Sequence, residues 1–150
     1  MKLIATNKKA ERDYEIFDRF EAGLVLTGTE VKSLRLGRAS INEAFIRIQD
    51  GEAYVFNMHI PEYPHGGIFN HDPTRSRKLL LHRREIDKIS GAISRKGYTC
   101  IPIKLYFRRG WAKLEIALAR GKRKIDKRQD IKRKELQRRL RRMTNGRVRV

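Results

Sequence analysis

The chain of 150 residues carries 36 lysine and arginine side chains against 17 aspartate and glutamate side chains, a net charge of +19. This excess is far more than solubility needs and favours polyanionic partners, which are nucleic acid or an anionic membrane surface. The longest uninterrupted apolar run, Ala22 to Leu26, has five residues, whereas a membrane-spanning helix needs roughly 20. The sequence therefore excludes insertion into a bilayer and favours nucleic acid.

The N-terminus and the cysteine content both indicate a cytoplasmic protein. Few apolar residues precede Asn7-Lys8-Lys9, too few for the apolar region of roughly 7 to 15 residues in a secretory signal. Cys100 is the single cysteine, which excludes an internal disulfide and agrees with a reducing compartment. Because Cys100 lies in an apolar run, we expect an inert packing residue.

The charge is distributed unevenly along the chain. Residues 121–150 hold 14 basic and 3 acidic side chains, a net charge of +11, which leaves +8 on the longer preceding part. That preceding part contains nearly all the aromatic and β-branched residues, so the core belongs there. We expect one folded domain over residues 1–121 and a basic C-terminal tail over residues 122–150.

The first predicted elements are a strand and a short helix. Apolar and polar residues alternate over 14–26, which predicts a strand with a bend at Gly23. Thr27 and Glu30 have the spacing of a capping box, and Gly37 ends the helix that they begin. For Glu30, helix capping and contact with an RNA both remain open. The exposed face of this helix would carry three cations: Lys32, Arg35 and Arg38.

A hairpin and a loop are predicted next. The dipeptide Asp50-Gly51 lies between two alternating runs and predicts the hairpin turn. Residues 61–74 are rich in Pro, Gly, His and Asn, which indicates a loop. Within it, Asn70 and Asp72 are expected to bond nearby backbone groups in a turn. A hydrolytic pair of His71 with Asp72 is the alternative interpretation.

A second helix and a second hairpin complete the predicted domain. Isoleucines at helical spacing predict a helix over 83–96 that Gly97 ends. Alternating residues over 100–118 predict a hairpin with the basic tip Arg108-Arg109-Gly110. Pro102 cannot donate a hydrogen bond to a ladder, so we expect it at a sheet edge or a bulge.

These elements together predict a mainly β fold. About six short strands with two or three short helices, in a basic protein of this size, are typical of a small antiparallel β-barrel of the OB kind. An open α+β sheet is the alternative.

The tail has good helix propensity and little apolar surface. Residues 126–143 contain no Gly or Pro. On a helix, the apolar residues would form a stripe only about 60° wide, too narrow to hold the tail to the body. We expect mutual repulsion to keep the tail disordered in the free protein, and a helix to form against phosphates. A nonspecific flexible tail is the alternative. The apolar residues of the stripe are Ile125, Leu136, Leu140 and Met143.

No motif in the sequence indicates catalysis, a metal or a cofactor. The histidines fit no zinc pattern, no second cysteine completes a metal site, and no Gly-rich phosphate loop is present. We therefore expect no enzymatic activity. Basic clusters with aromatic residues among them favour RNA binding instead, and the cations of a cluster such as Arg75 to Lys78 can neutralise phosphates.

Several stretches resemble one known family. They are Glu21 to Arg35 (EAGLVLTGTEVKSLR), Asn70-His71-Asp72-Pro73 with Arg77 to His82, Leu105-Tyr106-Phe107, and Ala117 to Lys122 with Asp126-Lys127-Arg128. Together they resemble the SsrA-binding protein family, also called small protein B, from about Asn7 to Arg128.

The resemblance implies an OB-like barrel that binds the tRNA-like domain of transfer-messenger RNA (tmRNA, SsrA) and delivers it to stalled bacterial ribosomes for trans-translation and ribosome rescue. The tail would occupy the decoding centre of the small subunit and the mRNA channel. Elongation factor Tu and alanyl-tRNA synthetase would be indirect partners through tmRNA. A generic ribosome-associated or single-strand RNA-binding OB protein is the alternative function.

The basic clusters and the matching motifs suggest two groups of site residues. The group expected to bind tmRNA on the body comprises Lys8, Lys9, Glu30, Lys32, Arg35, Lys122 and Arg123. The group expected to bind the ribosome comprises Lys124, Asp126, Lys127, Arg128, Lys132, Arg133, Arg138, Arg139, Arg141 and Arg142. Many members of the family carry an aromatic or histidine side chain before the Asp-Lys-Arg triplet. Ile125 stands there in this chain and could pack against a base but not stack on it.

Overall fold

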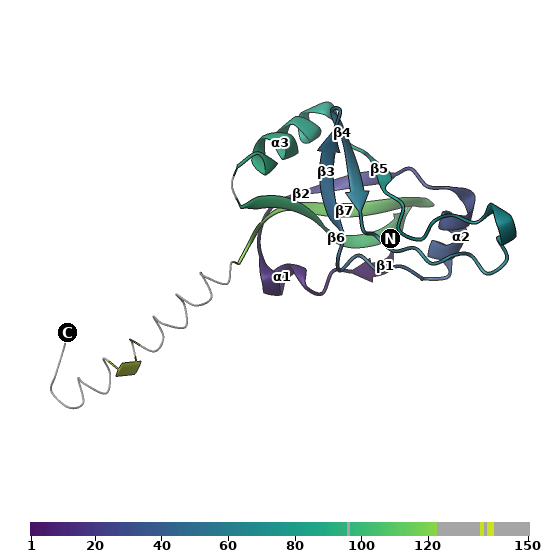
Figure 1. Cartoon of the computed structure of the whole chain (residues 1–150), viewed down its shortest axis with the longest axis horizontal. Coiled ribbons are helices and arrows are strands. Elements are labelled where there is room, and N and C mark those ends of the chain that lie inside the picture. Colours follow the sequence, from purple (N-terminus) through teal and green to yellow (C-terminus); the bar gives the residue numbers. More distant parts are fainter. Residues whose placement is uncertain (96, 123–135, 137, 140–150) are drawn as a thin grey trace.

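A computed structural model of the chain describes residues 1–95, 97–122, 136, 138 and 139 (Figure 1). Seven strands carry the fold of this described part. They are β1 (Lys2–Thr6), β2 (Tyr14–Leu24), β3 (Phe45–Gln49), β4 (Glu52–Phe56), β5 (Arg77–Leu80), β6 (Tyr98–Arg108) and β7 (Trp111–Gly121). The helices are α1 (Ala10–Asp13), α2 (Gly28–Arg35) and α3 (Arg83–Ile93), with a 3-10 turn η1 (Gly67–Phe69).

The strands form a closed antiparallel barrel. Their order is β1-β6-β3-β4-β5-β2-β7, and β6 also pairs with β7. This last pairing closes a ring of six strands, while β1 lies beside the far end of β6, where Leu3 pairs with Tyr106. Closure removes free sheet edges from the ring. The predicted barrel of about six strands is confirmed, and the alternative of an open sheet is wrong.

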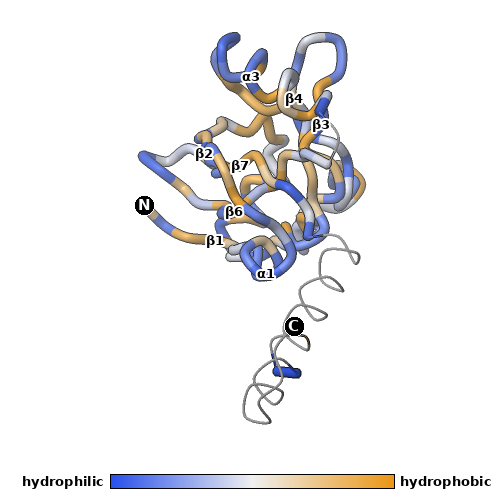
Figure 2. The backbone as a smooth tube through the Cα atoms, turned by 90° about the vertical axis from the view of Figure 1, so that its left-hand side faces the viewer, coloured by the Kyte–Doolittle hydropathy of each residue, from blue (hydrophilic) through white to orange (hydrophobic). Residues whose placement is uncertain are grey.

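The barrel interior is the main hydrophobic core. Ile46, Val55 and Leu114 point into it from three strands and are buried, as period-two alternation requires. Helix α3 packs Ile89 and Ile93 against this core, and its Ile86 is buried as well. A smaller cluster on the outside of β6 and β7 lies against α1. The hydrophobic stretches of the chain gather on the strands, and many connecting turns are hydrophilic (Figure 2).

Both predicted hairpins are confirmed, and each turns through two residues with positive φ. Asp50 and Gly51 have φ of 51° and 76°, and Arg109 and Gly110 have φ of 52° and 81°. Two consecutive residues with positive φ match the right-handed twist of the flanking strands. The β6–β7 register shifts between Pro102 and Lys104, so Pro102 lies at a bulge rather than on a free edge.

The first part of the chain differs from the prediction. Strand β1 and the short helix α1 were not expected. Strand β1 has five residues and α1 has four, so the pattern of each is too short to be recognised in the sequence. Strand β2 bends at a register shift between Ile16 and Arg19 rather than at Gly23. Gly23 instead allows close approach of Leu80, whose Cβ would lie 3.3 Å from a Cβ added there. Helix α3 ends at Ile93, earlier than expected.

Candidate nucleic-acid interface

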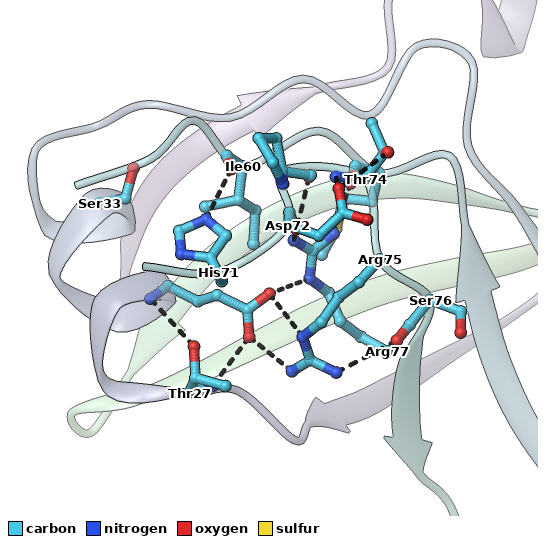
Figure 3. A network of polar contacts seen from close by, with 12 residues as sticks. Thr27, Ser33, Ile60, His71, Asp72, Thr74, Arg75, Ser76 and Arg77 are labelled. Carbon is cyan, nitrogen blue, oxygen red and sulfur yellow. Dashed lines mark hydrogen bonds and ion pairs between the residues drawn. The ribbon is translucent and has the colours of Figure 1, made fainter. Parts of the chain in front are cut away.

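Helix α2 begins with a capping box that is also the centre of a buried ionic network (Figure 3). The backbone N–H of Thr27 donates to Oε1 of Glu30 at 2.8 Å, and the Thr27 hydroxyl accepts from the Glu30 N–H. The Glu30 side chain has no exposed surface. A buried carboxylate needs charged partners as well as a cap, and two arginines supply them.

Arg75 and Arg77 both donate to Glu30. Arg75 forms a two-pronged contact, with Nη2 at 2.5 Å from Oε1 and Nε at 3.1 Å from Oε2. Arg77 donates through Nε to Oε2 and through its terminal nitrogens to the carbonyls of Met58 and Pro73. The Arg77 side chain is completely buried, whereas that of Arg75 is 33% exposed. Arg75 therefore adds a partly accessible cation beside α2.

The network holds the pKa of Glu30 below its usual value. Burial alone would raise this pKa, but the hydrogen bonds from Arg75, Thr27 and Arg77 together outweigh it. Glu30 is therefore ionised at neutral pH and compensates the buried charge of Arg77.

The predicted loop after β4 is tied to α2 by polar contacts rather than by regular structure. Nε2 of His71 lies 2.7 Å from the Ile60 carbonyl, which can only accept, so Nε2 carries the proton and Nδ1 accepts from the Thr29 hydroxyl at 2.9 Å. Ser33 donates to the Pro61 carbonyl at 2.7 Å. Both side-chain nitrogens of His71 are thus engaged in holding the loop.

The turn predicted within this loop is confirmed. Asn70 exchanges two hydrogen bonds with the backbone of Tyr63, at 3.0 and 2.7 Å. Asp72 accepts from the Thr74 N–H at 3.0 Å. The Asp72 carboxylate contacts Thr74 and not His71, so the hydrolytic pairing of His71 with Asp72 finds no support in this geometry.

The outer face of α2 is cationic. Lys32 and Arg35 are exposed on this helix, as the sequence predicts, whereas Arg38 is exposed but lies three residues beyond the last residue of α2. Lys32 Nζ lies 5.7 Å from the centre of the Tyr63 ring, so the helix and the loop share one surface. Because the buried side of α2 is fixed by the Glu30 network, this basic face is presented by a rigid support.

The remaining body residues proposed from the sequence lie apart from α2. Lys9 forms an ion pair with Glu43. The backbone N–H of Lys8 donates to Oδ1 of Asn42 at 3.0 Å. The Lys122 N–H donates to the Asp13 carbonyl at 2.9 Å, where β7 ends. The structure does not bring Lys8, Lys9 or Lys122 into contact with the α2 face.

Comparison with known proteins decides the family. The model of the family described as SmpB protein matches residues 4–146. An SsrA-binding protein of Geobacillus thermodenitrificans (strain NG80-2) is 52% identical over 149 residues, covering 99% of this chain and 96% of the relative. The chain belongs to the SmpB family.

Two further likenesses agree with this membership. An SsrA-binding protein of Fervidobacterium nodosum is 55% identical over 141 residues, covering 93% of this chain and 95% of the relative. A solved structure described as "tmRNA-SmpB: a journey to the center of the bacterial ribosome" is 47% identical, with a TM-score of 0.68 over 80% of this chain and 85% of that chain. The SmpB family is an RNA-binding family and not a family of enzymes.

Two expectations about charged side chains need correction. Glu30 was expected to face an RNA, but its carboxylate is fully buried and serves to cap α2 and pair two arginines. Arg77 was expected to neutralise phosphate within a basic cluster, but it is fully buried as well. The spacing of Arg75 and Arg77 could have indicated that both arginines reach the same partner, since residues two apart point to the same side of an extended chain. Nothing in the sequence marks Glu30, 47 residues away, as their partner.

The tail residues proposed from the sequence fall mostly outside the described part. Arg138 and Arg139 are described and exposed. The others lie outside the described residues, together with Ile125 and all of the predicted tail helix over 126–143 except Leu136, Arg138 and Arg139. They are Arg123, Lys124, Asp126, Lys127, Arg128, Lys132, Arg133, Arg141 and Arg142.

The described residues contain neither a metal-binding cluster nor a membrane-spanning helix. In residues 1–95 and 97–122, with the three described tail residues, no group of three or more His, Cys, Asp or Glu side chains is placed to hold a metal ion. None of the helices in that same part is long and apolar enough to span a membrane.

Proposed function

We propose that this protein binds the tRNA-like domain of tmRNA and delivers it to stalled ribosomes for trans-translation, without catalysing a reaction and within the cytoplasm. The observation that carries the proposal is the family match over residues 4–146, on a chain whose net charge is +19. A folded RNA is a polyanion with a defined shape, and a rigid barrel with fixed cations is suited to recognise it.

The body is proposed to hold the RNA through the face of α2. Lys32 and Arg35 are exposed on this face, and Arg75 contributes a third cation that is kept in place by Glu30. Phosphate contacts from fixed cations set the position and orientation of a nucleic acid. In this arrangement Glu30 acts indirectly, because it fixes the helix and orients Arg75.

The tail is proposed to act on the ribosome. The last 30 residues carry a net charge of +11, more than half of the total excess. A segment with this charge is attracted strongly to ribosomal RNA, and ordering on contact with phosphate is favoured by the loss of its own repulsion. We propose that the domain boundary falls at about residue 121, with the tail reaching the decoding centre and the mRNA channel. Elongation factor Tu and alanyl-tRNA synthetase would act on the complex through tmRNA.

A binding titration tests the proposal for the body. The full chain should bind a transcript of the tRNA-like domain of tmRNA much more tightly than an unstructured strand of equal length. Equal affinity for the two RNAs would contradict the proposal and favour a generic single-strand-binding barrel. The comparison should be made at one fixed salt concentration, since affinity for any RNA depends on salt.

A further inference from the structure

Trp111 is the single tryptophan of the chain and is 72% exposed. It is the first residue of β7 and directly follows the tip of the β6–β7 hairpin. A large indole ring in water leaves apolar surface uncovered, and aromatic rings in this situation commonly form contact surfaces for partners.

Trp111 forms one wall of an open hollow of ≈ 490 Å³ on the outside of the barrel. The other lining residues are Glu21, Arg108, Arg109 and Lys113. Three cations thus surround one carboxylate, and that carboxylate already accepts from Arg108 at 2.8 Å and from the Tyr106 hydroxyl. Within the described residues, the side chain of Arg109 makes no hydrogen bond or ion pair, so the hollow has positive charge available for a ligand.

The hollow is preformed by the barrel. Trp111 pairs with Arg108 in the β6–β7 ladder, and the tip is set by the positive φ of Arg109 and Gly110. Lys113 pairs with Gly23 of β2 on its other side. Next to Gly23 a second hollow of ≈ 370 Å³ shares Glu21 and Lys113 and adds Leu80, an exposed apolar side chain. A continuous surface therefore runs across β7, β2 and β5, with the Trp111 ring at one side, Leu80 at the other and Lys113 between them.

We propose that an unpaired base of the RNA carried by the body stacks on the Trp111 indole, with its flanking phosphates beside Arg109 and Lys113. Stacking on aromatic rings combined with backbone contact by cations is how proteins bind single-stranded nucleotides. Loops of a folded RNA offer such bases, whereas paired bases cannot reach the ring. This inference rests on the proposed function and adds a second contact surface to the α2 face.

The position of the hollow assigns it to the carried RNA rather than to ribosomal RNA. Strand β7 has 11 residues, and at about 3.3 Å per residue its two ends lie roughly 33 Å apart. Trp111 is at one end, and the basic tail departs from the other end, after Gly121. Helix α2 begins at Gly28, five residues after Gly23, at the same end of the barrel as Trp111. The hollow and the α2 face can therefore contact one RNA, away from the origin of the tail.

The single tryptophan makes the test direct. The full chain is titrated with a transcript of the tRNA-like domain while indole emission and RNA binding are followed in parallel. We expect quenching that saturates together with binding. Replacement of Trp111→Ala should weaken binding by about 5- to 100-fold, and Trp111→Phe should restore most of the loss, because a phenyl ring still stacks. The matched control is Phe17→Ala, an aromatic side chain that is 41% exposed on the part of β2 that pairs with the far end of β7, outside the hollow and the α2 face, and whose removal should leave binding unchanged.

The salt dependence of binding separates stacking from charge. Arg109→Gln and Lys113→Gln should each reduce the slope of log affinity against log salt by roughly 0.7 to 0.9, whereas Trp111→Ala should leave the slope unchanged. Each variant should keep the melting temperature of the parent, since the replaced side chains are on the surface or the rim.

The outcomes distinguish this inference from the function on which it rests. Normal binding with unchanged emission, or with an unaffected Trp111→Ala variant, would overturn the inference and leave the proposed function standing. Quenching by ribosomes but not by the transcript would overturn the assignment to the carried RNA. Absence of binding to the transcript by the parent protein would overturn both proposals.

Discussion

The guanidinium group of Arg77 donates to the carboxylate of Glu30 at a point where neither side chain has any exposed surface. The two residues lie 47 positions apart and join β5 to helix α2. The cationic face of α2 is thus oriented by a contact on the opposite side of the same helix. The buried Arg77–Glu30 pair therefore stabilises the fold and also orients the face that is proposed to bind RNA, although neither side chain can touch the RNA itself.

Loss of Arg77 should destabilise the protein strongly. Arg77→Ala leaves the Glu30 carboxylate buried with one partner fewer and should lower the free energy of unfolding by about 3–5 kcal/mol, the usual cost of breaking a buried pair. Urea denaturation followed by circular dichroism measures the change. Arg75→Ala is the control and should cost less, because Arg75 is 33% exposed. Equal losses in the two variants would argue against a special role for the buried pair.

The Glu30 network also predicts a loss of stability in acid. The folded state lowers the pKa of Glu30, so its contribution is complete above the ordinary value of 4.5 and is lost as the pH falls through the lowered folded value. The free energy of unfolding should therefore decrease as the pH falls below about 4.5. Glu30→Gln removes this titration, and the difference between the parent and the variant should shrink over the same pH range. A constant difference would show that Glu30 does not titrate there.

The α2 face should contribute to RNA binding through charge alone. Lys32→Ala with Arg35→Ala should weaken binding of the tRNA-like transcript and reduce the salt slope by roughly 0.7 to 0.9 per residue. Arg84 on α3 and Arg95 just after it are exposed cations, and their joint replacement by Ala is a control that removes the same two charges at a different place on the barrel. If this control had the same effect as the α2 variant, general charge rather than a defined face would explain the binding.

Cys100 should be unreactive in the folded protein. Its side chain is buried in the barrel core, and burial raises the pKa of the thiol to about 12. Since the thiolate is the reactive form, a thiol reagent such as iodoacetamide at pH 8 should label the native protein very slowly and the urea-unfolded protein rapidly. Mass spectrometry of the two samples checks this, and fast labelling of the native form would contradict the described core.

Removal of the tail should separate the two proposed activities. A chain ending at Arg123, which keeps every body residue expected to bind the RNA, should bind the tRNA-like transcript with nearly the parent affinity but should fail to support tagging of stalled products. Arg141→Glu combined with Arg142→Glu should reduce tagging more than RNA affinity, because reversed charges repel ribosomal RNA. Tagging at the parent level by the truncated chain would exclude a role of the tail on the ribosome.

The barrel could be predicted because its elements carry local patterns. The turn at Asp50-Gly51 and the tip at Arg108-Arg109-Gly110 mark two hairpins, and Thr27 with Glu30 marks the start of α2. Strand β1 could not be predicted in the same way. Its identity as a strand depends on pairing with β6, about 100 residues later in the chain.

The charged site was only partly predictable for the same reason. The exposed face with Lys32 and Arg35 follows from helical spacing alone. The burial of Glu30 and Arg77 depends on packing between α2, β5 and the loop from Met58 to Thr74, and on hydrogen bonds to backbone carbonyls of that loop. A charged residue in a basic sequence is most often on the surface, and only the folded arrangement shows the exception.

The point at which the chain leaves the barrel is fixed by main-chain atoms. Gly121 pairs with Tyr14, and the Lys122 N–H donates to the Asp13 carbonyl, so no side chain is needed to anchor this exit. Substitutions in the last 28 residues leave the anchor in place, and those residues can diverge in sequence without shifting their starting point. Insertions directly after Lys122 would act differently, since each added residue moves the following cations by up to about 3.5 Å along their path. The distance from this exit to each tail cation is therefore set by the number of residues between them.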